Sequence, residues 1–137
     1  MPVDRITLPN KHCTLRLMPM PAELNPHGDV FGGWVMAQVD VAGAIPAMQR
    51  AQGRVATVSV NSFLFKQPIS VGDIVSLYAD IVRVGSTSIT VKVEVFAERN
   101  YAAPIIVKVT EAELTYVAID GDGMKRQVPP ENSVKMV

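Results

Sequence analysis

Asp40 is the residue of this chain whose setting most strongly indicates chemistry. It is the only ionisable side chain between Asp29 and Arg50, and it lies in an apolar run that begins at Gly33. A bare carboxylate in a protein core costs several kcal/mol or more, so Asp40 must be hydrogen-bonded, protonated or next to a cavity. It is therefore the first candidate for a functional group.

Gly32 and Gly33 stand at the start of the same run, where the pattern predicts the beginning of a helix. The first N–H groups of a helix have no partner within it, and glycines let a carbonyl oxygen approach them closely. Such donors could stabilise an oxyanion in acyl transfer, an effect of about 2.7 to 4 kcal/mol per donor. Asp40 lies roughly 10 Å further along the helix axis. One bound group therefore reaches both only if it enters along the helix or if a partner subunit supplies part of the site.

The helix face that carries Asp40 is built largely of small residues. Positions three, four and seven away share this face, and they are Gly33, Met36, Ala37, Gly43, Ala44 and Ala47. Small neighbours leave room for a ligand or for the close approach of another chain. The alternative is a structural Asp40 that accepts hydrogen bonds from a neighbouring strand or subunit, but the glycine-rich entrance favours the functional interpretation.

One helix and a run of strands must position these groups. The helix is expected from about Gly33 to Ala51, with Gly53 as its C-terminal cap. Period-two patterns and turn signals predict strands at 12–18, 54–65, 73–84, 88–98 and 105–120. Short connections require these strands to pair mostly antiparallel. The prediction is an α+β fold with one long helix and a sheet of about five strands.

The first three turns of the helix are apolar on nearly all sides, which is typical of a helix inside a protein. We expect a curved sheet to wrap the helix, leaving sheet surface and edges for a second subunit, so that a dimer completes the core. Pro46 falls inside the helix and should kink it or end it early. Residues 121–137 are expected to form a turn and a loosely held C-terminal tail.

Length and composition exclude several classes of protein. The 137 residues predict a single domain, 1–137. Thirteen basic and thirteen acidic residues, with no basic cluster, argue against nucleic acid as a partner. No apolar stretch reaches the length of a membrane span, and no secretory signal is visible. The single Cys13 fits a cytoplasmic location, and with only two histidines no metal site and no cofactor are expected.

Four segments of the chain resemble the hotdog-fold acyl-CoA thioester hydrolases of the YciA type. They are residues 25–40 (NPHGDVFGGWVMAQVD), 53–60 (GRVATVSV), 65–73 with FKQP and VGD, and 110–120 (TEAELTYVAID). The likeness covers almost the whole chain, and the first segment is the most specific. Pro46 departs from the ordinary helix former expected there.

The resemblance implies a hotdog fold and a set of roles. Asp40 would be the general base or the nucleophile in hydrolysis of an acyl-CoA. The amide at Gly33 would polarise the thioester carbonyl, and Asn25 would position water or substrate. The family's sites are shared, so Asn25 of one subunit would work with Asp40 of the other. The assembly would be a homodimer, with three dimers forming a hexamer.

The expected contacts to coenzyme A are less specific. The pantetheine arm would run along Val58, Ser59 and Val60, after the helix, and Gly32 would also contact substrate. Lys66, Arg54 and Arg83 are candidates for the phosphates. Ser86 and Thr87 form a polar loop whose simpler interpretation is a hairpin turn. Acyl chain-length preference would depend on pocket depth near Met36 and Met48.

Three alternatives remain. His27 with a buried acid would suit a hotdog dehydratase acting on a hydroxyacyl thioester, although a loop histidine is more often solvated. A non-catalytic acyl-CoA-binding module would need an output element, for which 137 residues filled by one fold leave no room. A purely structural homo-oligomer would not need a charged group in its central helix.

Overall fold

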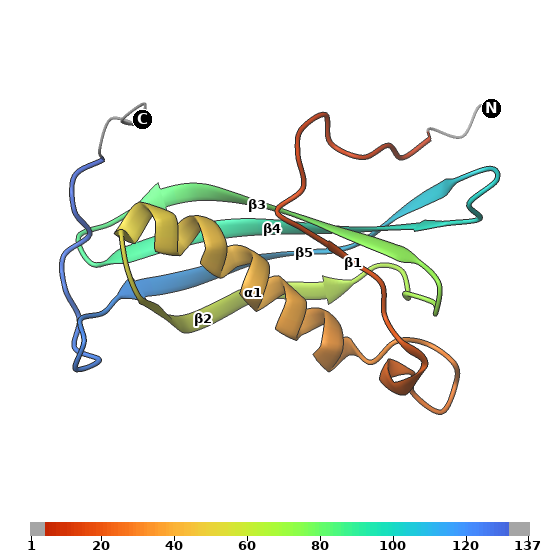
Figure 1. Ribbon diagram of the computed structural model, residues 1–137, viewed down its shortest axis with the longest axis horizontal. Helices are drawn as coiled ribbons and strands as arrows, with labels where there is room; N and C mark the ends of the chain where they lie inside the picture. Colours follow the sequence, from red (N-terminus) through yellow and green to blue (C-terminus); the bar gives the residue numbers. More distant parts are fainter. Residues whose placement is uncertain (1–4, 132–137) are drawn as a thin grey trace.

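The computed structural model describes residues 5–131 and contains one α-helix and one antiparallel sheet (Figure 1). In chain order the elements are β1 (Leu15–Leu17), a 3-10 turn (Pro21–Glu23), α1 (Gly32–Ala51), β2 (Val55–Phe65), β3 (Ile74–Val84), β4 (Ser88–Arg99) and β5 (Ile105–Ala118). The α+β fold predicted from the sequence is confirmed, and the predicted bounds of the helix and the four long strands differ from these by two residues at most. Within the described residues, no helix has both the length and the apolar character needed to cross a membrane.

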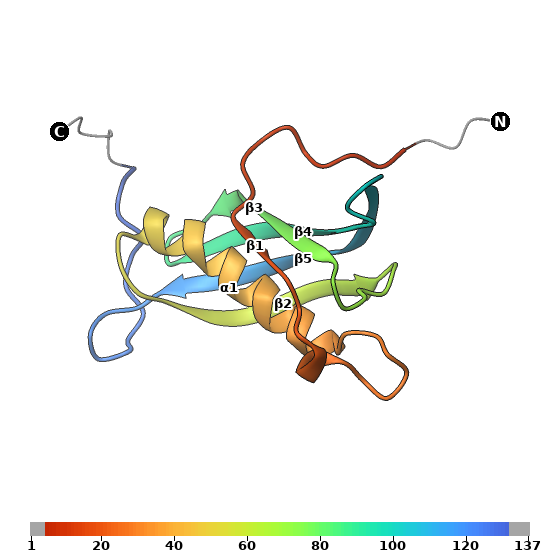
Figure 2. The ribbon, with the colours of Figure 1, turned by 45° about the vertical axis from the view of Figure 1, so that its right-hand side comes forward.

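The sheet has the strand order β1-β3-β4-β5-β2, and α1 lies across one of its faces (Figures 1 and 2). The alternation in β4 explains this packing. Ile89, Val91, Val93 and Val95 are fully buried members of the core that the helix also joins. Among residues 5–131 the long β2 pairs only with β5, so it forms one edge of the described sheet.

The helix buries one face against the sheet and leaves the opposite face open. Its buried residues follow a spacing of three to four, at Val35, Val39, Ala42, Gly43, Ala47 and Ala51. Elsewhere on the helix Met36, Val41 and Met48 remain 43 to 51% exposed. One sheet covers only one side of the helix in a single chain, and the expected cover by a second subunit stays a prediction. The open apolar face is available to another molecule.

Pro46 does not end the helix, which continues to Ala51. Proline removes only the hydrogen bond to the carbonyl of Ala42, and the buried Ala47 and Ala51 hold the following turn against the core. The expected early end is therefore wrong. The left-handed residue at the C-terminus is Gln52, with φ of 55°, and not the predicted Gly53.

The C-terminal segment is attached to the end of α1 as far as the structure describes it. The Arg126 guanidinium donates to the carbonyls of Ala51 at 2.8 Å and Ile119 at 3.0 Å. The Val128 N–H donates to the Ser86 carbonyl at 2.8 Å. Hydrogen bonds thus attach the expected tail segment to the fold up to Val128, and residues 132–137 lie outside the described part.

Candidate active site

Asp40 lies half-buried near the middle of α1, on the side next to β2 and β5. Its Oδ1 accepts a hydrogen bond from the Thr57 hydroxyl at 2.7 Å and from the Tyr116 hydroxyl at 3.2 Å. Its Oδ2 accepts no hydrogen bond from any group within residues 5–131. The carboxylate is thus paired through one oxygen and open through the other, which leaves Oδ2 able to bind a proton or attack a carbon.

Thr57 and Tyr116 reach Asp40 from neighbouring strands. They are directly opposed in the register of β2 and β5, immediately before a shift in the pairing of β2. Sequence reasoning did not single out either residue. The alternation of β5 offered a signal for Tyr116, since it continues the inward-facing series of Ala112 and Leu114. Thr57 carried no comparable signal, because threonine is common in strands.

Tyr116 is a fully buried hydrogen-bond donor in this site. Burial, with the neighbouring charge of Asp40 and the hydrogen bond to it, raises the pKa of the Tyr116 hydroxyl well above its ordinary value. The phenol therefore stays protonated, and able to donate, around neutral pH. The same hydroxyl donates to the backbone carbonyl of Asp40 at 2.7 Å.

The entrance of α1 provides a second set of polar groups. No side chain caps the helix at Phe31, and the N–H groups of Trp34 and Val35 both point to the Phe31 carbonyl. The N–H groups of Gly32 and Gly33 have no acceptor within residues 5–131. Apart from its neighbours in the helix, a Cβ added at Gly33 would have no atom of residues 5–131 within 4 Å, whereas a Cβ added at Gly32 would lie 3.2 Å from the Phe65 ring. Two free donors therefore stand at the entrance, as the sequence predicted.

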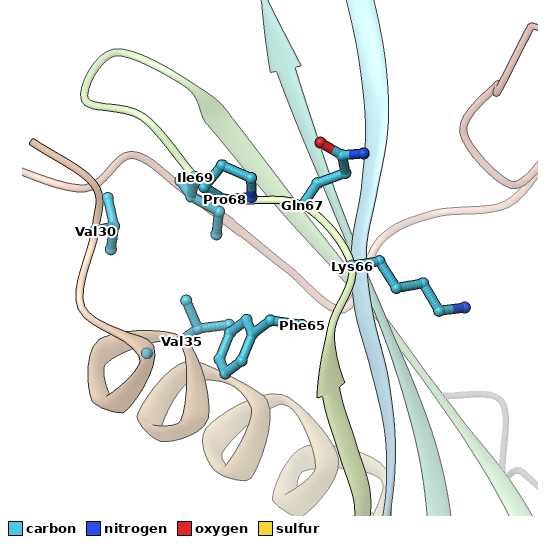
Figure 3. Close-up of a pocket in the computed structure, with 8 residues that line it drawn as sticks. Val30, Val35, Phe65, Lys66, Gln67, Pro68 and Ile69 are labelled. Carbon is cyan, nitrogen blue, oxygen red and sulfur yellow. The ribbon is translucent and has the colours of Figure 1, made fainter. Parts of the chain in front are cut away.

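A cavity of about 300 Å³ adjoins this entrance, between α1 and the end of β2 (Figure 3). It is lined by Val30, Gly32, Val35, Phe65, Lys66, Gln67, Pro68 and Ile69. The Lys66 side chain extends away from the hollow, so most of the wall is apolar (Figure 3). An apolar group could lie here while a carbonyl reached the free donors at the start of the helix.

Asn25 organises the loop that precedes the helix. Its Oδ1 accepts the N–H groups of His27 at 2.9 Å and Asp29 at 3.1 Å. No hydrogen bond joins Asn25 or His27 to Asp40 within the described chain. Within one chain, therefore, no hydrogen bond links Asn25 to Asp40, the two side chains that the resemblance assigned to one site.

The predicted contacts to coenzyme A fall into two groups. Val58, Ser59 and Val60 follow Thr57 on the edge strand β2, which borders the site, and Lys66 comes just after the end of that strand. Arg83, Ser86 and Thr87 belong to the β3–β4 hairpin, which lies near the C-terminal end of α1 (Figure 1). Within one chain, this second group is remote from the helix entrance.

The family model of the Thioesterase superfamily matches residues 27–103, which include the glycine entrance, Asp40 and Thr57. The chain belongs to the thioesterase superfamily. The predicted resemblance is confirmed at the level of individual relatives as well. The acyl-CoA thioester hydrolase YciA of Salmonella typhimurium is 46% identical over 88% of this chain and 92% of its own length. YciA of Escherichia coli is 44% identical over 90% and 96%.

Solved structures of thioesterases share the fold. The hexameric hotdog fold thioesterase Cj0915 of Campylobacter jejuni is 41% identical and aligns with a TM-score of 0.83, covering 87% of this chain and 91% of its own. HI0827, a hexameric broad specificity acyl-coenzyme A thioesterase, gives 44% identity and a TM-score of 0.83 over 92% and 86%. The hotdog fold predicted from the sequence is confirmed.

Proposed function

We propose that this protein hydrolyses acyl-CoA thioesters to a free carboxylic acid and coenzyme A. The observation that carries the proposal is the half-buried Asp40, held through Oδ1 and open at Oδ2, on a helix that begins with two free N–H donors. The names of the relatives support the substrate class, because YciA proteins are acyl-CoA thioester hydrolases.

The geometry suggests how the reaction proceeds. The thioester carbonyl binds at the Gly33 N–H, which stabilises the negative charge that the oxygen gains when the carbonyl carbon is attacked. In one version Oδ2 of Asp40 takes a proton from water, the water oxygen attacks the carbon, and the thiolate of coenzyme A leaves and receives that proton. In the other version Oδ2 itself attacks the carbonyl carbon and coenzyme A leaves as the thiolate. Water then hydrolyses the mixed anhydride, which frees the carboxylic acid, restores the Asp40 carboxylate and supplies the proton that the thiolate takes up. Both versions use the same free oxygen.

Two subunits would share each site in this account. Gly33 and Asp40 are separated by roughly 10 Å along one helix, which a single thioester group does not span. No hydrogen bond joins Asn25 to Asp40 within residues 5–131. Met36, Val41 and Met48 are exposed apolar side chains, and β2 is an edge strand of the sheet in the described residues. We therefore assign Asn25 and Gly33 of one subunit to Asp40 of the other. Three such dimers would form a hexamer, the assembly that HI0827 and Cj0915 adopt.

Subunit complementation tests this sharing. Asn25→Ala and Asp40→Asn chains are each expected to be inactive alone, because each damages every site. Mixed oligomers, refolded together, contain sites with both groups intact and should regain activity. Mixed oligomers that stay inactive would contradict the shared site, although not the chemistry.

The substrate would extend from the entrance in two directions. We propose that the acyl chain enters the apolar cavity beside Gly32 and that the pantetheine arm follows Val58, Ser59 and Val60 along β2. Lys66 is suited to a phosphate, since it points away from the cavity at the end of that strand. Because Arg83, Ser86 and Thr87 lie near the other end of α1, they would contact coenzyme A only from a partner subunit.

The proposed compartment is the cytoplasm, where thiols stay reduced. Cys13 is a free thiol in the described chain. The dehydratase alternative gains no support, since His27 is exposed and its side chain makes no hydrogen bond within residues 5–131.

A screen over acyl-CoAs of differing chain length, with thiol release as the readout, tests the proposed function. Release of coenzyme A is the expected result. Binding without release would indicate a non-catalytic module, and neither binding nor release would indicate a structural oligomer. Conversion of a hydroxyacyl-CoA to an enoyl-CoA without thiol release would indicate the dehydratase.

A further inference from the structure

Tyr116 contacts Asp40 twice, at its backbone carbonyl and at its carboxylate. Its single hydroxyl lies 2.7 Å from the Asp40 carbonyl and 3.2 Å from Oδ1 of the same residue. The ring is fully buried on β5, so neither it nor the hydroxyl can follow a moving partner. The backbone contact fixes the hydroxyl against the helix, and the second contact then fixes one oxygen of the carboxylate.

These contacts restrict the orientation of the Asp40 carboxylate. The terminal torsion of an aspartate is broad, so the plane of an unrestrained carboxylate turns freely. Here the buried Tyr116 hydroxyl and the more exposed Thr57 hydroxyl both donate to Oδ1. The carboxylate plane is held from two sides, and Oδ2 is left as the oxygen without a donor.

Gly43 is the helix position that makes room for this contact. A Cβ at Gly43 would clash with the Tyr116 hydroxyl oxygen and would lie 3.2 Å from two ring carbons. Gly43 is buried and has an ordinary helical position one turn after Asp40, so its backbone does not require glycine there. A glycine in a helix interior is destabilising relative to alanine. The close approach of the hydroxyl accounts for its presence.

We propose that Tyr116 is a positioning residue for thioester hydrolysis, which holds Oδ1 of Asp40 so that Oδ2 faces the water or the thioester. The proposal rests on the function proposed above and adds a residue to it. Tyr116 does not touch the substrate in this account. It acts through the orientation of Asp40, and Gly43 is required so that its hydroxyl can reach that position.

Tyr116→Phe tests the proposal, because it removes the hydroxyl and keeps the ring. A misplaced reacting group can cost up to about 10²-fold, so we expect kcat to fall by roughly 10- to 100-fold while KM stays nearly constant. Tyr78→Phe is the matched control. Tyr78 is also buried in the sheet, on β3, and its hydroxyl makes no hydrogen bond within the described residues. The control should keep the parent kcat.

Gly43→Ala provides an independent approach to the same contact. The added methyl should displace the Tyr116 hydroxyl, so this variant should lose kcat as Tyr116→Phe does and should also melt at a lower temperature. A double variant that combines Gly43→Ala with Tyr116→Phe lacks the Tyr116 hydroxyl, so most of the clash with the added methyl disappears. Its kcat should equal that of Tyr116→Phe alone, and its melting temperature should rise above that of Gly43→Ala.

The outcomes separate this proposal from the proposed function. If the parent protein releases no thiol from any acyl-CoA, the proposed function fails. If the parent is active and Tyr116→Phe keeps its kcat, or raises only KM, the positioning role alone is overturned. Losses of kcat that simply multiply in the Gly43→Ala, Tyr116→Phe double variant would also overturn it.

Discussion

The two ends of helix α1 are built in opposite ways. At the N-terminus no side chain caps the helix, and the N–H groups of Gly32 and Gly33 have no acceptor within residues 5–131. At the C-terminus Gln52 turns the chain back in a left-handed conformation and Arg126 binds the Ala51 carbonyl. Both ends carry four orphan backbone groups in principle. The C-terminal end is closed by groups of the chain itself, whereas the N-terminal end keeps the two donors, unpaired in the described chain, that the proposed thioester site requires.

Removal of an N–H donor at the N-terminal end of α1 should have the largest effect on activity. Gly33→Pro deletes one N–H, and proline is tolerated in the first turn of a helix. We expect kcat to fall by about 10² to 10³-fold, as for loss of an oxyanion donor, with little change in melting temperature.

Gly33→Ala is the control for that variant, because it keeps the N–H and its methyl would meet open space. It should retain most of the activity. Equal losses in the two variants would show that the space beside Gly33 matters and that its N–H does not.

The cavity at the open end should set the choice of acyl chain. Phe65 forms part of its wall and packs against Gly32, so Phe65→Ala should lengthen the space available to an acyl group. We expect the ratio of kcat/KM for long over short acyl-CoAs to rise by about tenfold, in line with the energy of a few buried methylenes. A ratio that stays constant across the chain-length series would show that the acyl group binds elsewhere.

A substitution at the C-terminal end of α1 should lower the free energy of unfolding and leave kcat unchanged. Arg126→Ala leaves the carbonyls of Ala51 and Ile119 without this donor, and loss of hydrogen bonds from a charged group costs about 1.5 to 3 kcal/mol. Urea unfolding should show that loss, while kcat at low temperature stays near that of the parent.

The neighbouring Lys125→Ala serves as the control for the closed end, since Lys125 is exposed and its side chain makes no ion pair or hydrogen bond within the described chain. It should leave both stability and activity unchanged. A large drop in kcat for Arg126→Ala would mean that the C-terminal segment also contributes to the site.

The sequence predicted the open end better than the closed one. A lone carboxylate and a glycine pair in an apolar run are local signals, and they led directly to Asp40 and Gly33. Arg126 reaches a carbonyl 75 positions away in the chain, and no local pattern reports such a contact. The helix likewise continues through Pro46 because of packing against the sheet, which local propensity does not include.

Thr57 and Tyr116 show the same limit within the site. Their partnership with Asp40 depends on the register of β2 against β5, and that register includes shifts after Thr57 and after Asn61. A one-residue slip would turn these side chains to the other face of the sheet. The period-two pattern predicts the strands, but it does not give the pairing that places two hydroxyls on one carboxylate.

The most direct test of the whole account is the turnover of Asp40→Asn, measured by thiol release from the best acyl-CoA substrate. Asparagine keeps an oxygen that accepts the Thr57 and Tyr116 hydroxyls but has no carboxylate at Oδ2. We predict that kcat falls by at least about 10² to 10⁴-fold, while coenzyme A affinity and melting temperature match those of the parent and of the exposed control Asp122→Asn. Retention of most of the parent kcat in Asp40→Asn would contradict the account.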